Sequence, residues 1–202
     1  MSAEEAAAKR AEFESGAAAD PGNVKLWTRY VSFELADGGG IEAGRALYER
    51  ALAALPDPSI ENYLYWSWSV AERDFGDVDG QRRVLEQWVG RLLRGGGLSG
   101  RQGWEEYLEF EVGNGGVERV RAVAEALLKA FPMDPFAYVL YVRALAALSR
   151  HLEAFAVAKR GINELSGWCP GHDEYLSRFM AKYIKRLKTK QSTAWDDSDL
   201  WE

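Results

Sequence analysis

The sequence predicts an all-α fold, a superhelix built from repeated helical hairpins, on the strength of three observations. Large residues recur at offsets of 38 and 39 residues along the chain. Within each block they stand three residues apart, which places them on one face of an α-helix and departs from the alternation of a β-strand. Glycine-containing turns separate the blocks. A fixed period of about 20 to 50 residues is typical of solenoids, in which each hairpin packs on the next.

The first helix of each predicted repeat carries these large residues, followed in the first three repeats by a glutamate. Such a block forms an amphipathic helix whose aromatic face enters the core. The three blocks are Trp27, Tyr30, Phe33 and Glu34; Tyr65, Trp68, Ala71 and Glu72; and Trp104, Tyr107, Phe110 and Glu111.

In the first three repeats the second helix opens with an arginine, and a glycine turn connects it to the first helix. Glycine suits such turns because it adopts positive φ without a steric penalty. Pro56 and Pro132 close the first and third repeats, since proline cannot continue a helix. The arginines are Arg45, which precedes Tyr48, then Arg82 and Arg121, and the turns lie at 38–40, 76–78 and 113–116.

A fourth and weaker copy begins at Tyr138 and Tyr141, where the spacing persists although the signature charges do not. Leu145 and Phe155 occupy its glutamate and arginine positions. The four repeats are therefore expected at roughly 24–56, 61–94, 101–132 and 135–166.

Further helices are expected on either side of the four repeats. The Ala- and Glu-rich stretch 3–15 has helix propensity and is expected to form a leading helix, equivalent to an orphan second helix. Apolar residues at helical spacing predict a capping helix over 172–188, which covers the apolar face of the last repeat. Residues 1–190 then form the predicted solenoid, and 191–202 form an acidic tail that contains two tryptophans.

The glutamate of the first helix and the arginine of the second helix, which we call the signature charges, recur together at similar spacing in the first three repeats. This recurrence suggests an ion pair inside each repeat. Removing one partner of a buried pair costs roughly 3 to 5 kcal/mol, whereas replacing both by apolar groups can be neutral. The joint replacement in the fourth repeat agrees with pairing, and unrelated surface charges are the alternative. The expected pairs are Glu34 with Arg45, Glu72 with Arg82, and Glu111 with Arg121.

The stretch from Trp27 to Pro56 resembles the HAT (half-a-TPR) repeat of RNA-processing scaffolds. It reads Trp-x2-Tyr-x2-Phe-Glu, a glycine turn, Gly-Arg-x-Leu-Tyr-Glu-Arg-Ala-Leu and a proline. An ordinary tetratricopeptide repeat has a period of about 34 residues and small residues at its packing positions, whereas aromatic residues lead here. The stretches 10–14 and 76–88 are similar to the N-terminal repeats of the crooked neck splicing factor family, and this similarity covers about 10–165.

The resemblance implies a right-handed superhelix of HAT/TPR-like hairpins that serves as a non-enzymatic protein-interaction scaffold in pre-mRNA splicing. It implies a nuclear location, and as partners the other splicing proteins of the nineteen complex of the spliceosome. Two alternatives are a HAT scaffold of mRNA 3′-end cleavage and polyadenylation, a group that often dimerises, and a TPR-like peptide-binding adaptor with a basic carboxylate clamp. Crooked neck proteins carry many more repeats than the four predicted here.

The composition argues against several classes of protein. The 202 residues include 25 Lys and Arg against 31 Asp and Glu, a net charge of −6, so we expect any RNA contact to be local. Cys169 is the only cysteine, which excludes an internal disulfide and favours a reducing compartment, cytosol or nucleus. No apolar run approaches the ~18 residues of a membrane span, and the acidic N-terminal residues do not resemble a secretory signal.

Motifs for catalysis and for metal or cofactor binding are weak. Gly95, Gly97 and Gly100 satisfy G-x-G-x-x-G, but no strand precedes them, and we interpret them as a loop. Cys169 and His172 supply only half of a four-ligand zinc site, and a turn before the last helix explains them better. Two histidines provide little material for a catalytic triad. We therefore expect a non-enzyme with no catalytic, cofactor-binding or metal-binding residues and no small-molecule substrate.

Two segments near the C-terminal end carry the remaining candidate sites. A basic run on or after the capping helix is either a solvated helix face or a contact for RNA or nuclear import. The acidic tail holds more apolar residues than a solvated tail requires, so we predict that it docks a partner, with folding back onto the basic run as the alternative. The residues are Lys182, Lys185, Arg186, Lys188 and Lys190 in the basic run, and Trp195, Leu200 and Trp201 in the tail.

Overall fold

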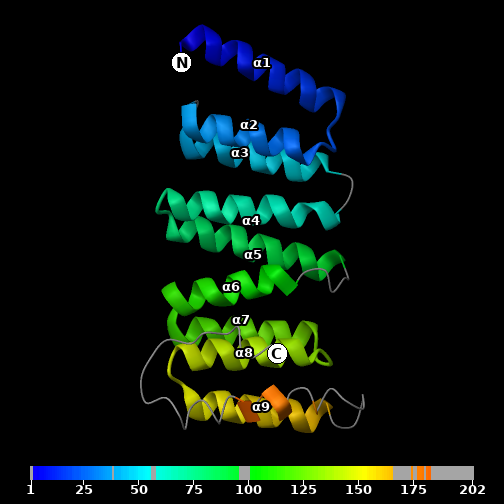
Figure 1. Ribbon diagram of the computed structural model, residues 1–202, viewed down its shortest axis with the longest axis vertical. Helices are drawn as coiled ribbons and strands as arrows, with labels where there is room; N and C mark the ends of the chain where they lie inside the picture. Colours follow the sequence, from blue (N-terminus) through cyan, green and yellow to red (C-terminus); the bar gives the residue numbers. More distant parts are fainter. Residues whose placement is uncertain are drawn as a thin grey trace. The chain divides into compact units, whose positions relative to one another are not determined.

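The computed structural model describes residues 2–37, 39–55, 58–95, 101–165, 174, 177–179 and 181–182. Every regular element in these ranges is an α-helix, which confirms the all-α prediction (Figure 1). None of the helices described is long and apolar enough to cross a membrane. The helices are α1 (Ala3–Ala19), α2 (Val24–Asp37), α3 (Gly40–Ala54), α4 (Pro58–Asp74), α5 (Val78–Gly95), α6 (Arg101–Asn114), α7 (Gly116–Ala130), α8 (Pro135–Ala147) and α9 (His151–Leu165).

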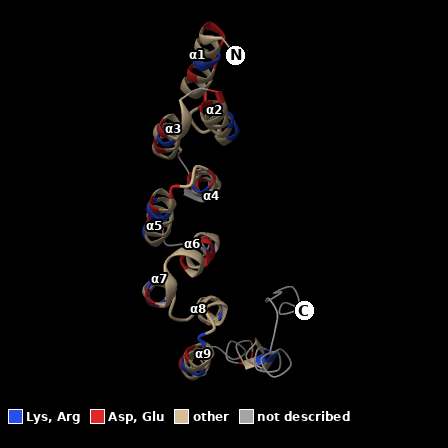
Figure 2. Ribbon diagram, turned by 90° about the vertical axis from the view of Figure 1, so that its left-hand side faces the viewer, with Lys and Arg blue, Asp and Glu red and all other residues tan. Residues whose placement is uncertain are grey.

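The chain forms two compact units, Met1–Trp104 and Glu105–Glu202, and each is described by itself. In the first unit α1 packs on α2, α2 on α3, α3 on α4, and α4 on α5. The helices α2 and α4 also touch and form one layer, while α3 and α5 form the other (Figure 2). In the second unit α7 packs on α8 and α8 on α9. Sequential packing of neighbours is the arrangement that the periodic hairpins predict.

The helix α1 extends further than the sequence indicated, to Ala19 instead of residue 15. It begins in a capping box, in which the Ser2 hydroxyl accepts the Glu5 N–H at 3.2 Å and the Ser2 N–H donates to the Glu5 carboxylate at 2.7 Å. Its last turn is rich in alanine, the strongest helix former, and packs Ala17 in the core.

The turns between paired helices contain residues with positive φ. Gly40, Gly76 and Gly116 have φ of +70°, +76° and +71°, so the predicted glycine turns are confirmed. In the fourth repeat Ser149 takes the same role at φ +60°. The next residue, Arg150, donates its N–H to the Leu145 carbonyl at 2.8 Å and closes the last turn of α8. A serine in this conformation carries a steric cost that glycine avoids.

The aromatic residues that open each first helix lie in the core. Trp27, Tyr65, Trp104 and Tyr138 are 3%, 7%, 2% and 1% exposed, so the four repeats place this position in like environments. The Trp27 indole N–H donates to the Pro21 carbonyl at 2.9 Å. The Trp104 indole N–H has no partner among the described residues.

The predicted capping helix lies largely outside the described residues. Residues 174, 177–179 and 181–182 are helical, and Phe179 is buried at 4% exposure. These positions fall within the expected range 172–188.

Candidate protein-interaction site

The signature charges pair between neighbouring repeats, and the prediction of a pair inside each repeat is wrong. Glu34 on α2 accepts two bonds from Arg10 on α1, at 2.6 and 3.0 Å. Glu72 on α4 accepts two bonds from Arg45 on α3, at 2.8 and 2.6 Å. Arg121 bonds Glu118 and Glu153 and has no bond to Glu111. Arg10 and Arg45 therefore each reach the first helix of the following repeat, because that helix packs against their own.

Aromatic rings stack between the same pairs of helices that these ion pairs connect. Phe13 on α1 stacks on Tyr30 with ring centroids 4.9 Å apart, and Tyr48 on α3 stacks on Trp68 at 5.4 Å. In each case the aromatic residue of the second helix follows its arginine by three positions, and the ring it meets precedes the glutamate by four. The Trp68 indole N–H also donates to Glu72 at 2.8 Å. The helix α1 thus makes the contacts of a second helix.

In the fourth repeat the signature glutamate is replaced by Leu145, although the third repeat still has its signature arginine, Arg121. Leu145 occupies the glutamate position and is fully buried. Arg121 on α7 instead bonds Glu153 in the first turn of α9, at 3.0 Å. The joint replacement of both charges in the fourth repeat therefore does not reflect a pair inside that repeat. By analogy with Glu34 and Glu72, the arginine that corresponds to the Leu145 position is Arg121 of the preceding helix, and Arg121 bonds Glu153 instead.

The charges around Arg45 form a polar cluster whose Glu72 side chain is fully buried. The hydrogen bond to Glu72 raises the pKa of the Arg45 guanidinium above its ordinary value, and Asp77 adds to this with a bond of 2.6 Å. The Gly80 N–H, which donates to Asp77 at 2.7 Å, and then Arg45 lower the pKa of the Asp77 carboxyl. A Cβ at Gly80 would lie 2.4 Å from the Glu72 carboxylate, so glycine is required for this close approach.

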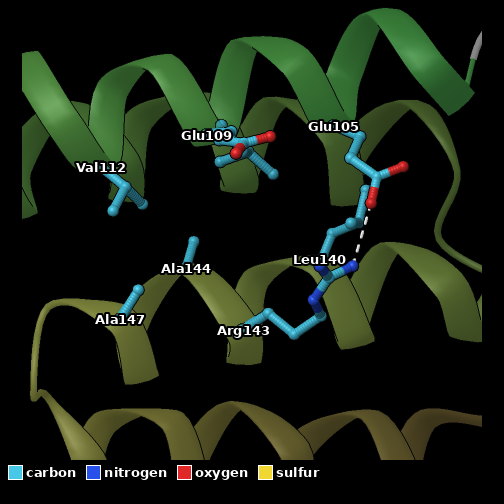
Figure 3. Close-up of a pocket in the computed structure, with 8 residues that line it drawn as sticks. Glu105, Glu109, Val112, Leu140, Arg143, Ala144 and Ala147 are labelled. Atoms are coloured by element: carbon cyan, nitrogen blue, oxygen red, sulfur yellow. Dashed lines mark hydrogen bonds and ion pairs between the residues drawn. The ribbon is translucent and has the colours of Figure 1, made fainter. Parts of the chain in front are cut away.

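A pocket of about 230 Å³ lies between the first helices α6 and α8 in the second compact unit (Figure 3). Apolar side chains from both helices form its floor. Arg143 donates to Glu105 at 2.9 Å across one end, and Glu109 lies exposed at the rim. The lining residues are Glu105, Leu108, Glu109, Val112, Leu140, Arg143, Ala144 and Ala147.

The lining of this pocket offers apolar surface beside an exposed carboxylate. Its floor offers aliphatic contacts, and the Glu109 carboxylate at its rim attracts a cation. No group of three or more His, Cys, Asp or Glu residues that could hold a metal occurs among the described residues. The pair Cys169 and His172 lies outside them.

The residues predicted from sequence divide into two groups. The aromatic signature residues lie in the core or at contacts between repeats, with Tyr107, Phe110 and Tyr141 buried like the rest. Lys182 is exposed, whereas Lys185, Arg186, Lys188, Lys190, Trp195, Leu200, Trp201 and part of the glycine loop at 95–100 lie outside the described residues.

Sequence reasoning missed the pocket between α6 and α8. One signal for it was present, since Leu108 and Val112 stand four residues apart and form a second apolar stripe beside the aromatic one. Such a stripe does not reveal which helix faces it. A comparison of the chain with models of known protein families finds no match, and a comparison with curated proteins finds none.

Proposed function

We propose that this protein is a non-enzymatic protein-interaction scaffold that acts in pre-mRNA splicing, as a component of the spliceosome on its nineteen-complex side. The observation that carries the proposal is the repeated contact in which an arginine and an aromatic residue of one helix meet an aromatic residue and a glutamate of the next repeat. Arg45, Tyr48, Trp68 and Glu72 make it. Positions in this contact also carry the resemblance to HAT repeats and to the crooked neck family.

The proposal includes three features of the fold and the location of the protein. We propose that the hairpins are HAT repeats, that they wind as a right-handed superhelix, and that the helix at 172–188 caps them. The protein is proposed to act in the nucleus. Ion pairs and stacked rings fix each repeat against its neighbour. Surface side chains are therefore presented at a fixed spacing, as a scaffold requires.

The pocket between α6 and α8 is the surface that we assign to partner binding. Leu108 and Leu140 at its floor accept an aliphatic or aromatic side chain, and Glu109 at its rim accepts a lysine or arginine. Residues four apart on a helix lie about 6 Å from each other. A partner helix with an apolar residue one turn from a basic residue therefore satisfies both features.

The test compares two arginine substitutions in the second compact unit. Ala147→Arg places a long side chain in the pocket, while Ala122→Arg makes the same change at an exposed position of α7 that is not part of the pocket lining. Tagged full-length variants are incubated with nuclear extract, and bound proteins and RNAs are quantified. We expect wild type and A122R to retain splicing proteins and spliceosomal RNAs, and A147R to lose them at least tenfold.

One outcome would contradict the splicing assignment, and a second would contradict the role of the pocket. Recovery of cleavage and polyadenylation factors without spliceosomal RNA would favour a 3′-end processing scaffold, and size determination would then be expected to show a dimer. Equal recovery by A147R and wild type would remove the pocket from the proposal.

Three arginines at or near the repeat contacts do not support a peptide-binding adaptor with a basic carboxylate clamp. Arg45, Arg121 and Arg143 each bond a carboxylate of the chain itself. Calorimetry with short peptides that end in a free carboxylate is therefore expected to show no binding. A dissociation constant in the low micromolar range would overturn this expectation.

A further inference from the structure

The helix α9 begins with an exposed apolar pair where the other second helices carry a charged pair. Three second helices open with an acidic residue that bonds an arginine three positions later. At the same two positions α9 carries Leu152, which is 89% exposed, and Phe155, which is 48% exposed. The charged pairs are Glu42–Arg45 at 2.6 Å, Asp79–Arg82 at 3.0 Å and Glu118–Arg121 at 2.6 Å.

This replacement changes the chemistry of the surface. Single exposed apolar residues are common, but Leu152 and Phe155 are one turn apart on the same helix face. Ala156 extends the apolar area, and Lys159 lies one turn beyond Phe155, exposed and without an ion pair in the described part of the chain. We call Leu152, Phe155, Ala156 and Lys159 the α9 patch. It combines an apolar surface with one cation.

Among the described residues, the carboxylate that adjoins the patch in sequence does not cancel that cation. Glu153, the nearest carboxylate in sequence, is bonded to both Arg121 and Arg150. Its charge is therefore already compensated. A ligand of the α9 patch is expected to carry large apolar side chains together with carboxylates.

We propose that the α9 patch binds the acidic tryptophan segment of this same chain, Trp195-Asp-Asp-Ser-Asp-Leu-Trp201. The segment contains two tryptophans and a leucine next to three aspartates. Its apolar residues match Leu152 and Phe155, and its carboxylates match Lys159. A tryptophan ring can also stack against the Lys159 ammonium group, which favours aromatic over aliphatic ligands.

Charge and reach both select this surface for the segment. The pocket between α6 and α8 carries the exposed Glu109 carboxylate at its rim, which repels aspartates. Residues 166–194 connect the end of α9 to Trp195. Even with the predicted helix at 172–188, the residues on either side of it, 166–171 and 189–194, cover about 40 Å when extended at about 3.3 Å per residue. Because α9 is only about 22 Å long, this connection can return the segment to any point of α9.

The test uses the full chain labelled with 5-fluorotryptophan and observed by ¹⁹F NMR. The chain has eight tryptophans, and Trp195→Phe and Trp201→Phe identify the two resonances of the segment. A synthetic peptide of residues 191–202 gives their unbound positions. We expect both resonances of the full chain to be shifted away from the peptide values.

The decisive variant is Leu152→Glu with Phe155→Arg. It installs the charged pair that the other second helices carry, so the fold is expected to tolerate it. Both segment resonances should then move to the peptide values, while the other resonances stay in place and serve as the control for folding. Lys159→Glu should produce a partial movement in the same direction, because it reverses the charge that faces the aspartates.

Three results would overturn the proposal. Wild-type resonances that coincide with those of the peptide would show that the segment is unbound. Shifted resonances that L152E/F155R leaves in place would assign the segment to another surface, such as the basic run. Shifts that vanish on dilution would assign it to a second copy of the chain. None of these results bears on the splicing proposal, which the A147R comparison tests separately.

Discussion

The buried ion pair between Arg45 and Glu72 gives the sharpest test of how neighbouring repeats hold together. The Glu72 side chain is 1% exposed and accepts bonds from Arg45 and from the Trp68 indole. In Arg45→Met the carboxylate stays buried with the indole as its remaining partner, so we expect a loss of about 3 to 5 kcal/mol. Glu72→Gln keeps an acceptor for Trp68 and leaves Arg45 bonded to Asp77, so its cost is expected to be about 1 to 2 kcal/mol.

The combination of the two substitutions is expected to reverse the effect of the second one. Glutamine needs no counter-charge, so Glu72→Gln should stabilise the Arg45→Met protein by about 2 to 3 kcal/mol. Urea unfolding of the four proteins, followed by circular dichroism, measures each step of this cycle. If Glu72→Gln destabilises both backgrounds equally, the reasoning from an uncompensated buried charge is refuted.

An exposed pair of similar geometry provides the control. Arg50 on α3 bonds Glu14 on α1 at 2.7 Å, and their side chains are 50% and 45% exposed. Solvent screens such a pair, so Arg50→Met is expected to cost less than about 1 kcal/mol. A cost as large as that of Arg45→Met would mean that burial does not set the difference.

Three further predictions concern the ends of the array and the buried phenols. Phe13→Ala should destabilise the protein by about 3 to 5 kcal/mol in urea, because this side chain is 6% exposed, whereas Glu12→Ala at an exposed position should have almost no effect. Ser149→Gly should raise stability by about 0.5 to 1 kcal/mol, since glycine accepts φ +60° without steric cost, and a lower thermal midpoint would contradict this. Burial raises the pKa of the Tyr30 and Tyr48 phenols to about 12 from 10.0. The neutral phenols therefore contribute their full stabilisation of the folded protein below pH 10, and this contribution is lost as the pH rises toward 12. The urea midpoint should fall over the same pH range in which absorbance at 295 nm reports tyrosine ionisation.

The repeats and their turns could be predicted because they depend on local chemistry. Aromatic spacing marks the buried face of a helix whatever it packs against, and glycine marks a turn that needs positive φ, as at Gly76. Helix propensity identified the region of α1 as an orphan second helix, and the structure shows that Arg10 and Phe13 make the contacts that Arg45 and Tyr48 make in α3. The end of α1 was missed because the alanines that extend it carry no periodic signal.

The ion pairs could not be predicted because a spacing in sequence does not tell which surface a helix side faces. The nearly constant interval between signature glutamate and signature arginine, 11 residues from Glu34 to Arg45 and 10 in the next two repeats, is compatible with a pair inside one repeat and equally with pairs between neighbouring repeats. The bonds from Arg10 to Glu34 and from Arg45 to Glu72 show the second arrangement. The pocket between α6 and α8 was hidden for the same reason, since its two walls lie about 35 residues apart in sequence.

By itself, the sequence determined that the chain forms helices, where the hairpins bend, and which aromatic residues enter the core, because hydrophobic periodicity and backbone sterics act over a few residues. Only the tertiary structure decided that Glu72 pairs with Arg45. It also decided that Arg121 bonds Glu153, since the corresponding position in α8 is the apolar Leu145. The exposure of Leu152 and Phe155 was likewise settled only there. These outcomes depend on the side on which the next helix lies, and on the desolvation of each charge by atoms distant in sequence.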